Sequence, residues 1–363
     1  MPFTPNCLPT AVGSMPHSNP QDAVELMLRY LPQIPTWPQL PNAGYLESMY
    51  LQYSGGMPFV TLDPAKERLF MDLRGDIWAD LERFYERVLE DDLEWFAITP
   101  QYASGLHAFI GRLWRTRPPE LVMVKGQVTG PISFGLMITD ERKRSVLYRE
   151  EVFDAVLKSL ALKARWQARQ LQRLHPQVLM FIDEPYLSSF GSAFINLSRD
   201  QVLQYLEEVV SAIHQEGALA GVHCCGNTDW SILMDTELDV INFDAYEYFQ
   251  GMTLYLDRLQ AFLKRGGVLA WGIVPTNPQI AQGSAETLRR KFLEQVADLE
   301  GRGIDREVLL RQSLLTPSCG MGSLSVETAG LVLQRLAEVS QAVRADLSAA
   351  PPKGKRAKTR ASA

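Results

Sequence analysis

Residues 177–226, QVLMFIDEPYLSSFGSAFINLSRDQVLQYLEEVVSAIHQEGALAGVHCCG, decide the fold of this chain. Two short apolar runs, 177–185 and 217–226, flank a stretch at 198–217 whose apolar residues recur at helical spacing. That stretch opens with a serine of the kind that caps helices. Apolar runs of this length, ended by Asp, Pro or Gly, are typical of buried parallel strands. The unit is therefore predicted to be strand, helix, strand.

The same alternation extends along the chain. Further helical patterns cover 149–174 and 284–303, and six more strand candidates lie at 9–17, 34–41, 120–131, 238–246, 266–275 and 314–320. Eight strands with helical crossovers predict a (β/α)8 TIM barrel. A doubly wound open sheet is the alternative, but neither GxGxxG nor GxxxxGK[ST] follows any of the strands, which removes the usual support for a nucleotide-binding fold.

The chain is predicted to form a single catalytic barrel over 1–350. Residues 42–118 form a long excursion between the second and third strands, with a hairpin near 58–73 and a helix near 78–92. We expect an inserted lobe there, in the role of a lid or a dimer surface. The segment 351–363 is rich in Pro, Ala and Lys/Arg with nothing to bury, and is predicted to be a disordered basic tail.

Composition narrows the class of function. Of 363 residues, 46% are hydrophobic and 21% charged, as in an ordinary globular enzyme. The net charge is −6, and the last thirteen residues contribute five positive charges, so the rest of the chain carries −11. An acidic body argues against a nucleic-acid partner. We also expect no membrane span, because no apolar run approaches the roughly 20 residues required. Four cysteines, two of them adjacent, predict no disulfide framework and a reducing cytoplasm.

Three candidate metal ligands stand at strand ends. His223 and Cys225 are two residues apart, so on a strand both side chains point the same way while Cys224 points elsewhere. Cys319 ends the last strand candidate, and Glu247 follows the sixth. Strand ends converge on one face of a barrel. One imidazole and two thiolates suit Zn²⁺, with Glu247 as an exchangeable fourth ligand. The alternative is that the cysteines are small buried hydrophobes.

These residues resemble the catalytic domain of cobalamin-independent methionine synthase and the related zinc thiol methyltransferases of the uroporphyrinogen-decarboxylase-like superfamily. The similar segments are AVGSMPH (11–17), VKGQVTGPIS (124–133), FIDEP (181–185), HCCGN (223–227), the glutamate at 247 and PSCG (317–320). They occur in the family's order. The resemblance implies a TIM barrel and methyl transfer to a zinc-bound thiol, with zinc held by His223, Cys225, Glu247 and Cys319.

The resemblance also implies roles around the thiol. Asp183 would hold the amino group of a homocysteine-like substrate, unless it is only a helix N-cap. Ser14 would contact the substrate carboxylate, unless it is a turn residue, and Glu47 would be a second ammonium contact. Other polar residues predicted at the barrel mouth are Lys125 and Thr129, on the donor side, and Glu184.

Two departures from the family bear on the methyl donor. Residues 271–278, WGIVPTNP, lack the histidine that the folate-dependent members carry after the seventh strand, and DEPYLSSF (183–190) lacks a following glutamate. Such a histidine would protonate a leaving folate nitrogen. We therefore expect a methyl-corrinoid, or a corrinoid protein, as the donor in preference to methyltetrahydrofolate. The alternatives are a metal-free decarboxylase of the same superfamily and a non-catalytic partner of a corrinoid protein.

Overall fold

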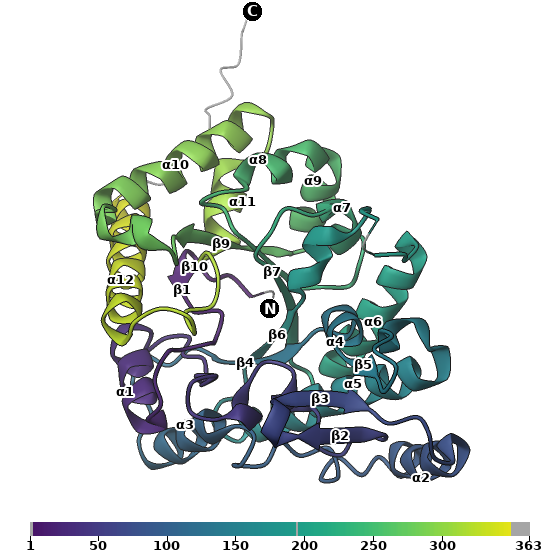
Figure 1. Ribbon diagram of the computed structural model, residues 1–363. Helices are drawn as coiled ribbons and strands as arrows, with labels where there is room; N and C mark the ends of the chain where they lie inside the picture. Colours follow the sequence, from purple (N-terminus) through teal and green to yellow (C-terminus); the bar gives the residue numbers. More distant parts are fainter. Residues whose placement is uncertain (1–2, 194, 350–363) are drawn as a thin grey trace, which may run out of the picture.

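One curled parallel sheet forms the centre of the molecule (Figure 1), in a computed structural model that describes residues 3–193 and 195–349. The predicted tail at 351–363 lies outside the described residues. Neighbouring strands pair in the order β1-β10-β9-β8-β7-β6-β4, and every pairing is parallel. The strands are β1 (Leu8–Pro9), β4 (Val124–Thr129), β6 (Val178–Asp183), β7 (Leu219–Cys224), β8 (Val240–Phe243), β9 (Val268–Val274) and β10 (Ser313–Pro317).

The gap between the two edge strands, β1 and β4, is occupied by residues 34–39. These residues form isolated parallel bridges on both sides, Ser14 with Gln39 and Thr36 with Lys125. The Lys125 N–H also donates to the Pro35 carbonyl at 2.9 Å. Prolines at positions 35, 38 and 41 have no N–H to donate, which prevents a regular ladder here. The predicted second strand therefore lies in its expected place, but the sheet is a TIM-barrel-like curl that no continuous ladder closes.

Helices surround the sheet (Figure 1). Helix α6 shows why the boundaries were readable from sequence: Ser198 accepts from the Gln201 N–H while the Gln201 side chain accepts from the Ser198 N–H, a complete capping box. The helices are α1 (Pro20–Tyr30), α2 (Ile77–Leu89), α3 (Ser104–Arg115), α4 (Pro131–Met137), α5 (Glu150–Gln172), α6 (Arg199–Gln215), α7 (Trp230–Met234), α8 (Phe249–Met252), α9 (Leu256–Lys264), α10 (Ala285–Gly301), α11 (Arg306–Arg311) and α12 (Val326–Ala349).

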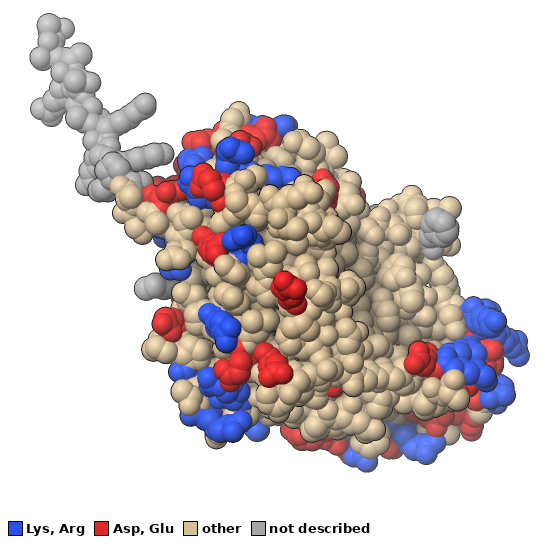
Figure 2. Space-filling model, turned by 60° about the vertical axis from the view of Figure 1, so that its left-hand side comes forward, with Lys and Arg blue, Asp and Glu red and all other residues tan. Residues whose placement is uncertain are grey.

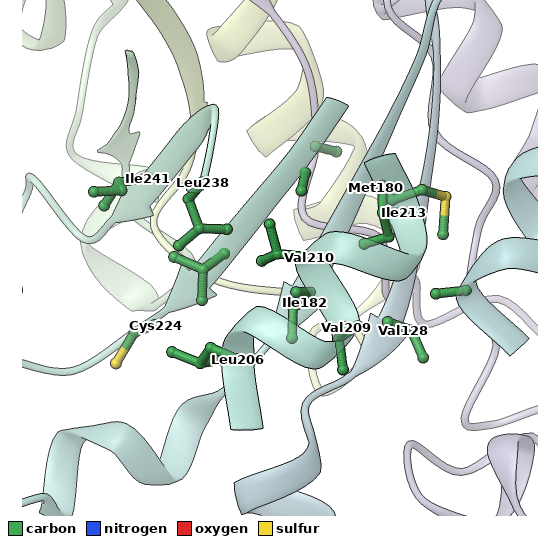
Figure 3. Packing of buried hydrophobic residues seen from close by; sticks show 14 of the residues in the cluster. Val128, Met180, Ile182, Leu206, Val209, Val210, Ile213, Cys224, Leu238 and Ile241 are labelled. Carbon is green, nitrogen blue, oxygen red and sulfur yellow. The ribbon is translucent and has the colours of Figure 1, made fainter. Parts of the chain in front are cut away.

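The side chains of each strand divide between two hydrophobic cores. One core lies between sheet and helices, where Met180, Ile182 and Cys224 pack with Leu206 and Ile213 of α6 (Figure 3). The other fills the inside of the curl, and its buried members are Leu8, Ile34, Met123, Leu179, Phe181, Val240, Val268, Ala270 and Leu314. Strand alternation thus gives each strand an inner and an outer row, so the last residue of each row is aimed at a different environment.

Residues 42–118 contain the predicted hairpin and helix. Strands β2 (Val60–Asp63) and β3 (Arg68–Met71) pair antiparallel, and β5 (Thr139–Asp140) adds to β3 in parallel. Helix α2 follows the hairpin, capped by Asp76. These elements lie at one side of the sheet (Figure 1), whereas α3, from the same segment, lies beside α1 among the helices around the sheet. The predicted excursion therefore includes one of the surrounding helices.

The outer surface carries both signs of charge. On the face drawn in Figure 2, Lys/Arg and Asp/Glu side chains are interspersed along the edges, and much of the surface between them is uncharged. Many of these charges pair locally, such as Arg302 with Asp298 one helical turn away. Within residues 3–193 and 195–349, none of the helices combines the length and the apolar character that a membrane crossing requires.

Candidate metal centre

His223, Cys225 and Cys319 converge at the end of the sheet. Their ligand atoms, one imidazole nitrogen and two sulfurs, all lie within 4.8 Å of one another. His223 is the last inward-facing residue of β7, Cys225 follows β7 by one residue, and Cys319 follows β10 by two. Tetrahedral zinc, with Zn–S bonds of about 2.3 Å and Zn–N bonds of about 2.0–2.1 Å, has ligand atoms roughly 3.5–4 Å apart. The predicted grouping of the three residues is confirmed, and its dimensions suit one metal ion.

The orientation of the His223 ring is fixed by Asn242 on the neighbouring strand. The two residues are register partners in the β7–β8 ladder, and His223 Nδ1 lies 2.6 Å from the Asn242 side-chain oxygen. The Asn242 amide nitrogen donates to the Ala270 carbonyl and to Thr316 Oγ1, each at 2.8 Å, so its oxygen must face the ring. In the neutral ring, the form that binds metal, Nδ1 therefore carries the proton and Nε2 the lone pair.

That Nε2 atom is buried and has no hydrogen-bond partner among the described residues. A buried nitrogen of this kind costs free energy unless a ligand satisfies it. Asn242 thus acts as the outer partner that metal-bound histidines commonly have. Asn242 was not among the predicted site residues, although a polar residue on the inner row of the apolar run at 238–246 was a usable signal.

The two thiols differ in acidity because they face each other. Cys319, together with His223, lowers the pKa of the Cys225 thiol to about 4, although partial burial opposes this. The pKa of Cys319 is raised, first because it donates to Cys225 and then because it is buried. Both side chains are half-buried. The arrangement favours the thiolate form of Cys225, which is the form in which cysteine binds a metal ion.

Ser14 holds the loop that carries Cys319. The Ser14 carbonyl accepts from the Met321 N–H at 2.9 Å, and its hydroxyl accepts from the Gly322 N–H at 3.3 Å. A Cβ on Gly320 would lie 2.1 Å from the Ser14 hydroxyl, so glycine is required beside Cys319. The segments that follow the first and last strands are joined in this way. Ser14 is half-buried and also lines the cavity described next.

A cavity of about 430 Å³ opens beside the three metal-ligand candidates. Two predicted substrate contacts, Asp183 and Glu47, lie on its wall. Asp183 Oδ1 and Glu47 Oε2 are buried without a hydrogen-bond partner in the described chain, while Glu47 Oε1 accepts from Ser104. Burial raises the pKa of Asp183 to about 6, although the charges of His223 and Lys125 oppose this, and burial also raises the pKa of Glu47. Asp183 Oδ1 and Glu47 Oε2 thus have no cationic group within hydrogen-bonding distance among the described residues.

Glu184 lies on the opposite side of the strand from Asp183 and does not line the cavity. Its two oxygens accept from the Ile132 and Ser133 N–H groups, each at 2.8 Å, and from the Ser133 hydroxyl at 2.6 Å. The carboxylate therefore caps the N-terminus of α4. A Cβ on Gly130 would lie 2.1 Å from this carboxyl carbon, so the approach requires glycine. The contacts give Glu184 a structural role, where the sequence suggested a group in the barrel mouth.

Lys125 is fully buried inside the curl and does not lie at the rim, where the sequence placed it. Its ammonium donates to the Val12 carbonyl at 2.7 Å and lies 4.2 Å from the centre of the Phe181 ring. Burial lowers the pKa of Lys125 to about 7, and the charge of Asp183 opposes this. The predicted rim position of Lys125 was wrong, because the inner row of β4 points into the barrel and buries this side chain. Thr129, four residues on, has a buried hydroxyl without a hydrogen-bond partner among the described residues.

The structure does not bring Glu247 into the metal group. Its side chain is exposed, and its backbone N–H donates to Asp244 Oδ1 at 2.9 Å. Asp244 follows β8 directly and caps the turn 244–248, in which the Tyr248 N–H also bonds to the Asp244 carbonyl. This turn holds the Glu247 backbone while leaving its side chain in solvent. Glu247 as the fourth ligand stays a prediction.

Comparison with known proteins gives a fold and no family. No protein-family model and no curated protein sequence matches the chain. Among solved structures it is similar to a B12-independent methionine synthase from Shewanella sp. W3-18-1, determined in complex with selenomethionine. The TM-score is 0.55 and the identity 15%, over 95% of this chain and 99% of that chain. At this identity the likeness shows the α/β, TIM-barrel-like fold alone.

A weaker likeness is to the catalytic modules of a pneumococcal exo-β-D-N-acetylglucosaminidase, with a TM-score of 0.45 and 9% identity over 94% of this chain and 89% of that one. A similarity at this level carries no functional information.

Proposed function

We propose that this protein is a zinc-dependent methyltransferase that moves a methyl group to a small thiol, most favourably homocysteine, to give methionine. The observation that carries the proposal is the juxtaposition of His223, Cys225 and Cys319 with the carboxylates Asp183 and Glu47 on one cavity. A soft cation site and an ammonium site within a single small cavity match the two ends of an amino-acid thiol.

The residues present fit a zinc ion. His223 offers a lone pair in the fixed tautomer, and the two sulfurs lie within 4.8 Å of it and of each other. Three protein ligands beside a cavity leave a coordination position for a substrate, as in catalytic sites. Glu247 is proposed as a fourth ligand that exchanges with the thiol, after its exposed side chain turns toward the cavity. When bound, zinc lowers the pKa of a coordinated thiol, so that it is held as the thiolate.

The remaining steps belong to the chain's own groups. Asp183 and Glu47 bind the substrate ammonium, which supplies the positive partner that their buried oxygens lack. Ser14 and the loop it holds flank the same cavity and position the carboxylate end. The bound sulfur attacks the methyl carbon in line: a sulfur–carbon bond forms, and the donor's leaving atom departs with the electron pair of the broken bond. Fixing sulfur and ammonium together supplies the orientation on which such a reaction depends.

A methyl-corrinoid is favoured as the donor. Strand β9 ends at Val274, and the residues that follow are held by structural contacts: Thr276 pairs with Ser318, and Asn277 caps the next turn. These groups cannot serve as a general acid for a leaving folate nitrogen. A corrinoid leaving group needs no proton. The absence of a titratable side chain in residues 275–278 therefore supports the corrinoid.

The cavity wall disfavours the alternative decarboxylase. Such an enzyme needs basic side chains to hold substrate carboxylates, and none of the described lining residues is Lys or Arg. Two unpaired carboxylates on the wall would repel an anionic substrate. The structural neighbour's complex with selenomethionine agrees in kind, since selenomethionine is an amino acid with a methylated chalcogen.

A metal-and-turnover experiment tests the proposal. The purified protein is analysed for zinc and assayed for methionine formation from homocysteine with methylcobalamin or methyltetrahydrofolate. We expect about one zinc per chain and turnover with methylcobalamin, both lost in Cys319→Ser. Zinc-loaded protein without turnover from either donor would overturn the function. Turnover with the folate and none with methylcobalamin would overturn the donor alone.

A further inference from the structure

Gln39 stands on the cavity wall with a polarity that the surrounding network fixes. It belongs to the 34–39 segment, is 6% exposed, and lines the same cavity as Glu47 and Asp183. A glutamine can present either an oxygen or an NH₂ group to a ligand, and the two orientations are opposite in charge preference. The orientation here follows from two hydrogen-bond chains, each of which ends at a main-chain carbonyl.

The first series of hydrogen bonds runs through Gln52. Its Nε2 donates to the Tyr102 carbonyl at 3.0 Å, and a carbonyl can only accept. The Gln52 Oε1 atom must therefore face Gln39, at 2.9 Å from Gln39 Nε2. Gln52 is 1% exposed, so its side-chain groups are shielded from solvent. The group that Gln39 presents to Gln52 must therefore be a hydrogen-bond donor.

The second series of hydrogen bonds runs through Tyr53. Its hydroxyl donates its single proton to the Gln127 carbonyl at 2.9 Å, so the oxygen can only accept on the Gln39 side. Gln39 Nε2 lies 3.0 Å from that oxygen. Tyr53 is fully buried. Both N–H groups of the Gln39 amide are thus committed to buried partners, and the group left to face the cavity is Oε1.

We infer that Gln39 is a specificity-determining residue that accepts an N–H of the substrate's amino group. Together, Gln39 Oε1, Glu47 Oε2 and Asp183 Oδ1 offer three acceptors to one cavity, and an ammonium group has three N–H donors. The inference rests on the proposed function. It adds that the substrate's amino group is recognised by a neutral hydrogen-bond acceptor as well as by the charge of the two carboxylates.

The test compares two thiols that differ by the amino group alone. Zinc-loaded protein is titrated calorimetrically with L-homocysteine and with 4-mercaptobutanoate. In Gln39→Met, which matches glutamine in length, we expect homocysteine binding to weaken by roughly ten- to a hundredfold, the range for a hydrogen bond to a charged group. Binding of 4-mercaptobutanoate should not change, because it makes no use of the acceptor. A purely structural role would weaken both thiols equally.

Tyr53→Phe is the matched variant, because it removes one of the two acceptors that hold Gln39 Nε2 and leaves the bond to Gln52. We expect it to retain most of the preference for homocysteine. A preference that is lost in Tyr53→Phe but kept in Gln39→Met, or equal effects on both thiols in Gln39→Met, would overturn the role of Gln39 while leaving the proposed function intact. Failure of the unsubstituted zinc-loaded protein to bind either thiol would overturn the proposed function, and this inference with it. Zinc content and far-ultraviolet circular dichroism verify that each variant is folded.

Discussion

The polar side chains at the ends of the inner and outer rows of β6 and β7 differ in whether they have hydrogen-bond or packing partners. On the inner side, Asp183 and His223 have buried polar atoms without partners in the described chain. On the outer side, Glu184 accepts three hydrogen bonds, and Cys224 packs in the core with α6 (Figure 3). The residues are sequence neighbours, so composition cannot explain the difference. The unsatisfied polar atoms lie on the side that we propose binds the ligand, and the satisfied ones lie on the side that supports the fold.

Replacing the adjacent cysteines gives the largest expected contrast. Cys225→Ser should reduce zinc content and methyl transfer to background, because it removes one of three converging ligands. Cys224→Ser should leave both largely intact, since the Cys224 sulfur contacts core residues and the Gly226 carbonyl. Elemental analysis and turnover with methylcobalamin measure the two effects. Equal behaviour of the two variants would show that the alternation argument is wrong.

The residues of the inner row were predictable from the sequence because their positions depend only on residue spacing. The i, i+2 relation of His223 and Cys225, and the ends of β6, β7 and β10, follow from short apolar runs with clear stops. Lys125 was predicted to lie at the rim because a lysine is seldom fully buried, whereas here a carbonyl and an aromatic ring hold its ammonium inside. Glu184 was predicted to lie in the barrel mouth because the sequence DEP does not show which of its two carboxylates faces the inside of the sheet.

Other features depend on contacts between distant segments. Gln39 owes its polarity to Gln52 and Tyr53, and Asn242 owes its orientation to strands β9 and β10. Neither relation leaves a pattern in the local sequence. The interrupted ladder at 34–39 was foreseeable from its prolines, and the exposed position of the Glu247 side chain was not, because a turn capped by Asp244 determines it.

The neighbouring carboxylates allow a second contrast. Asp183→Asn should lower kcat/KM for homocysteine. The expected loss of transition-state stabilisation is about 2–5 kcal/mol, the range for truncating one partner of a buried charge pair. Its effect on folding should be small, because Asp183 Oδ1 has no partner to lose in the described chain. Glu184→Gln should show the reverse: binding is kept, while the free energy of unfolding falls by about 1–3 kcal/mol as the α4 cap loses an acceptor. Steady-state kinetics and urea unfolding separate the two.

The Glu184 effect should also depend on pH. Burial raises the pKa of Glu184 to about 7, although the hydrogen bonds from α4 oppose this. A carboxyl group whose folded pKa exceeds its unfolded value contributes stability at low pH, and loses it as pH rises through the folded pKa. The destabilisation by Glu184→Gln should therefore be largest near pH 4.5 and should shrink toward pH 7. A penalty that grows with pH would mean that the ionised carboxylate is the stabilising form.

A smaller effect on zinc than that of Cys225→Ser is expected from Asn242, which lies on β8 beside His223 and does not line the cavity. Asn242→Leu should weaken zinc binding by roughly 10–100-fold, the usual cost of losing a histidine's outer partner. The physical reason is that His223 Nδ1 would lose its acceptor, so the ring could rotate or take the other tautomer, and Nε2 would no longer be held toward the two sulfurs. Competition with a chelator measures the affinity. Thr316→Val is the matched control, since it removes one of the two bonds that orient Asn242 and leaves the bond to Ala270. It should therefore weaken zinc less than Asn242→Leu does, and a larger effect of Thr316→Val would place the control of the ring elsewhere than in Asn242.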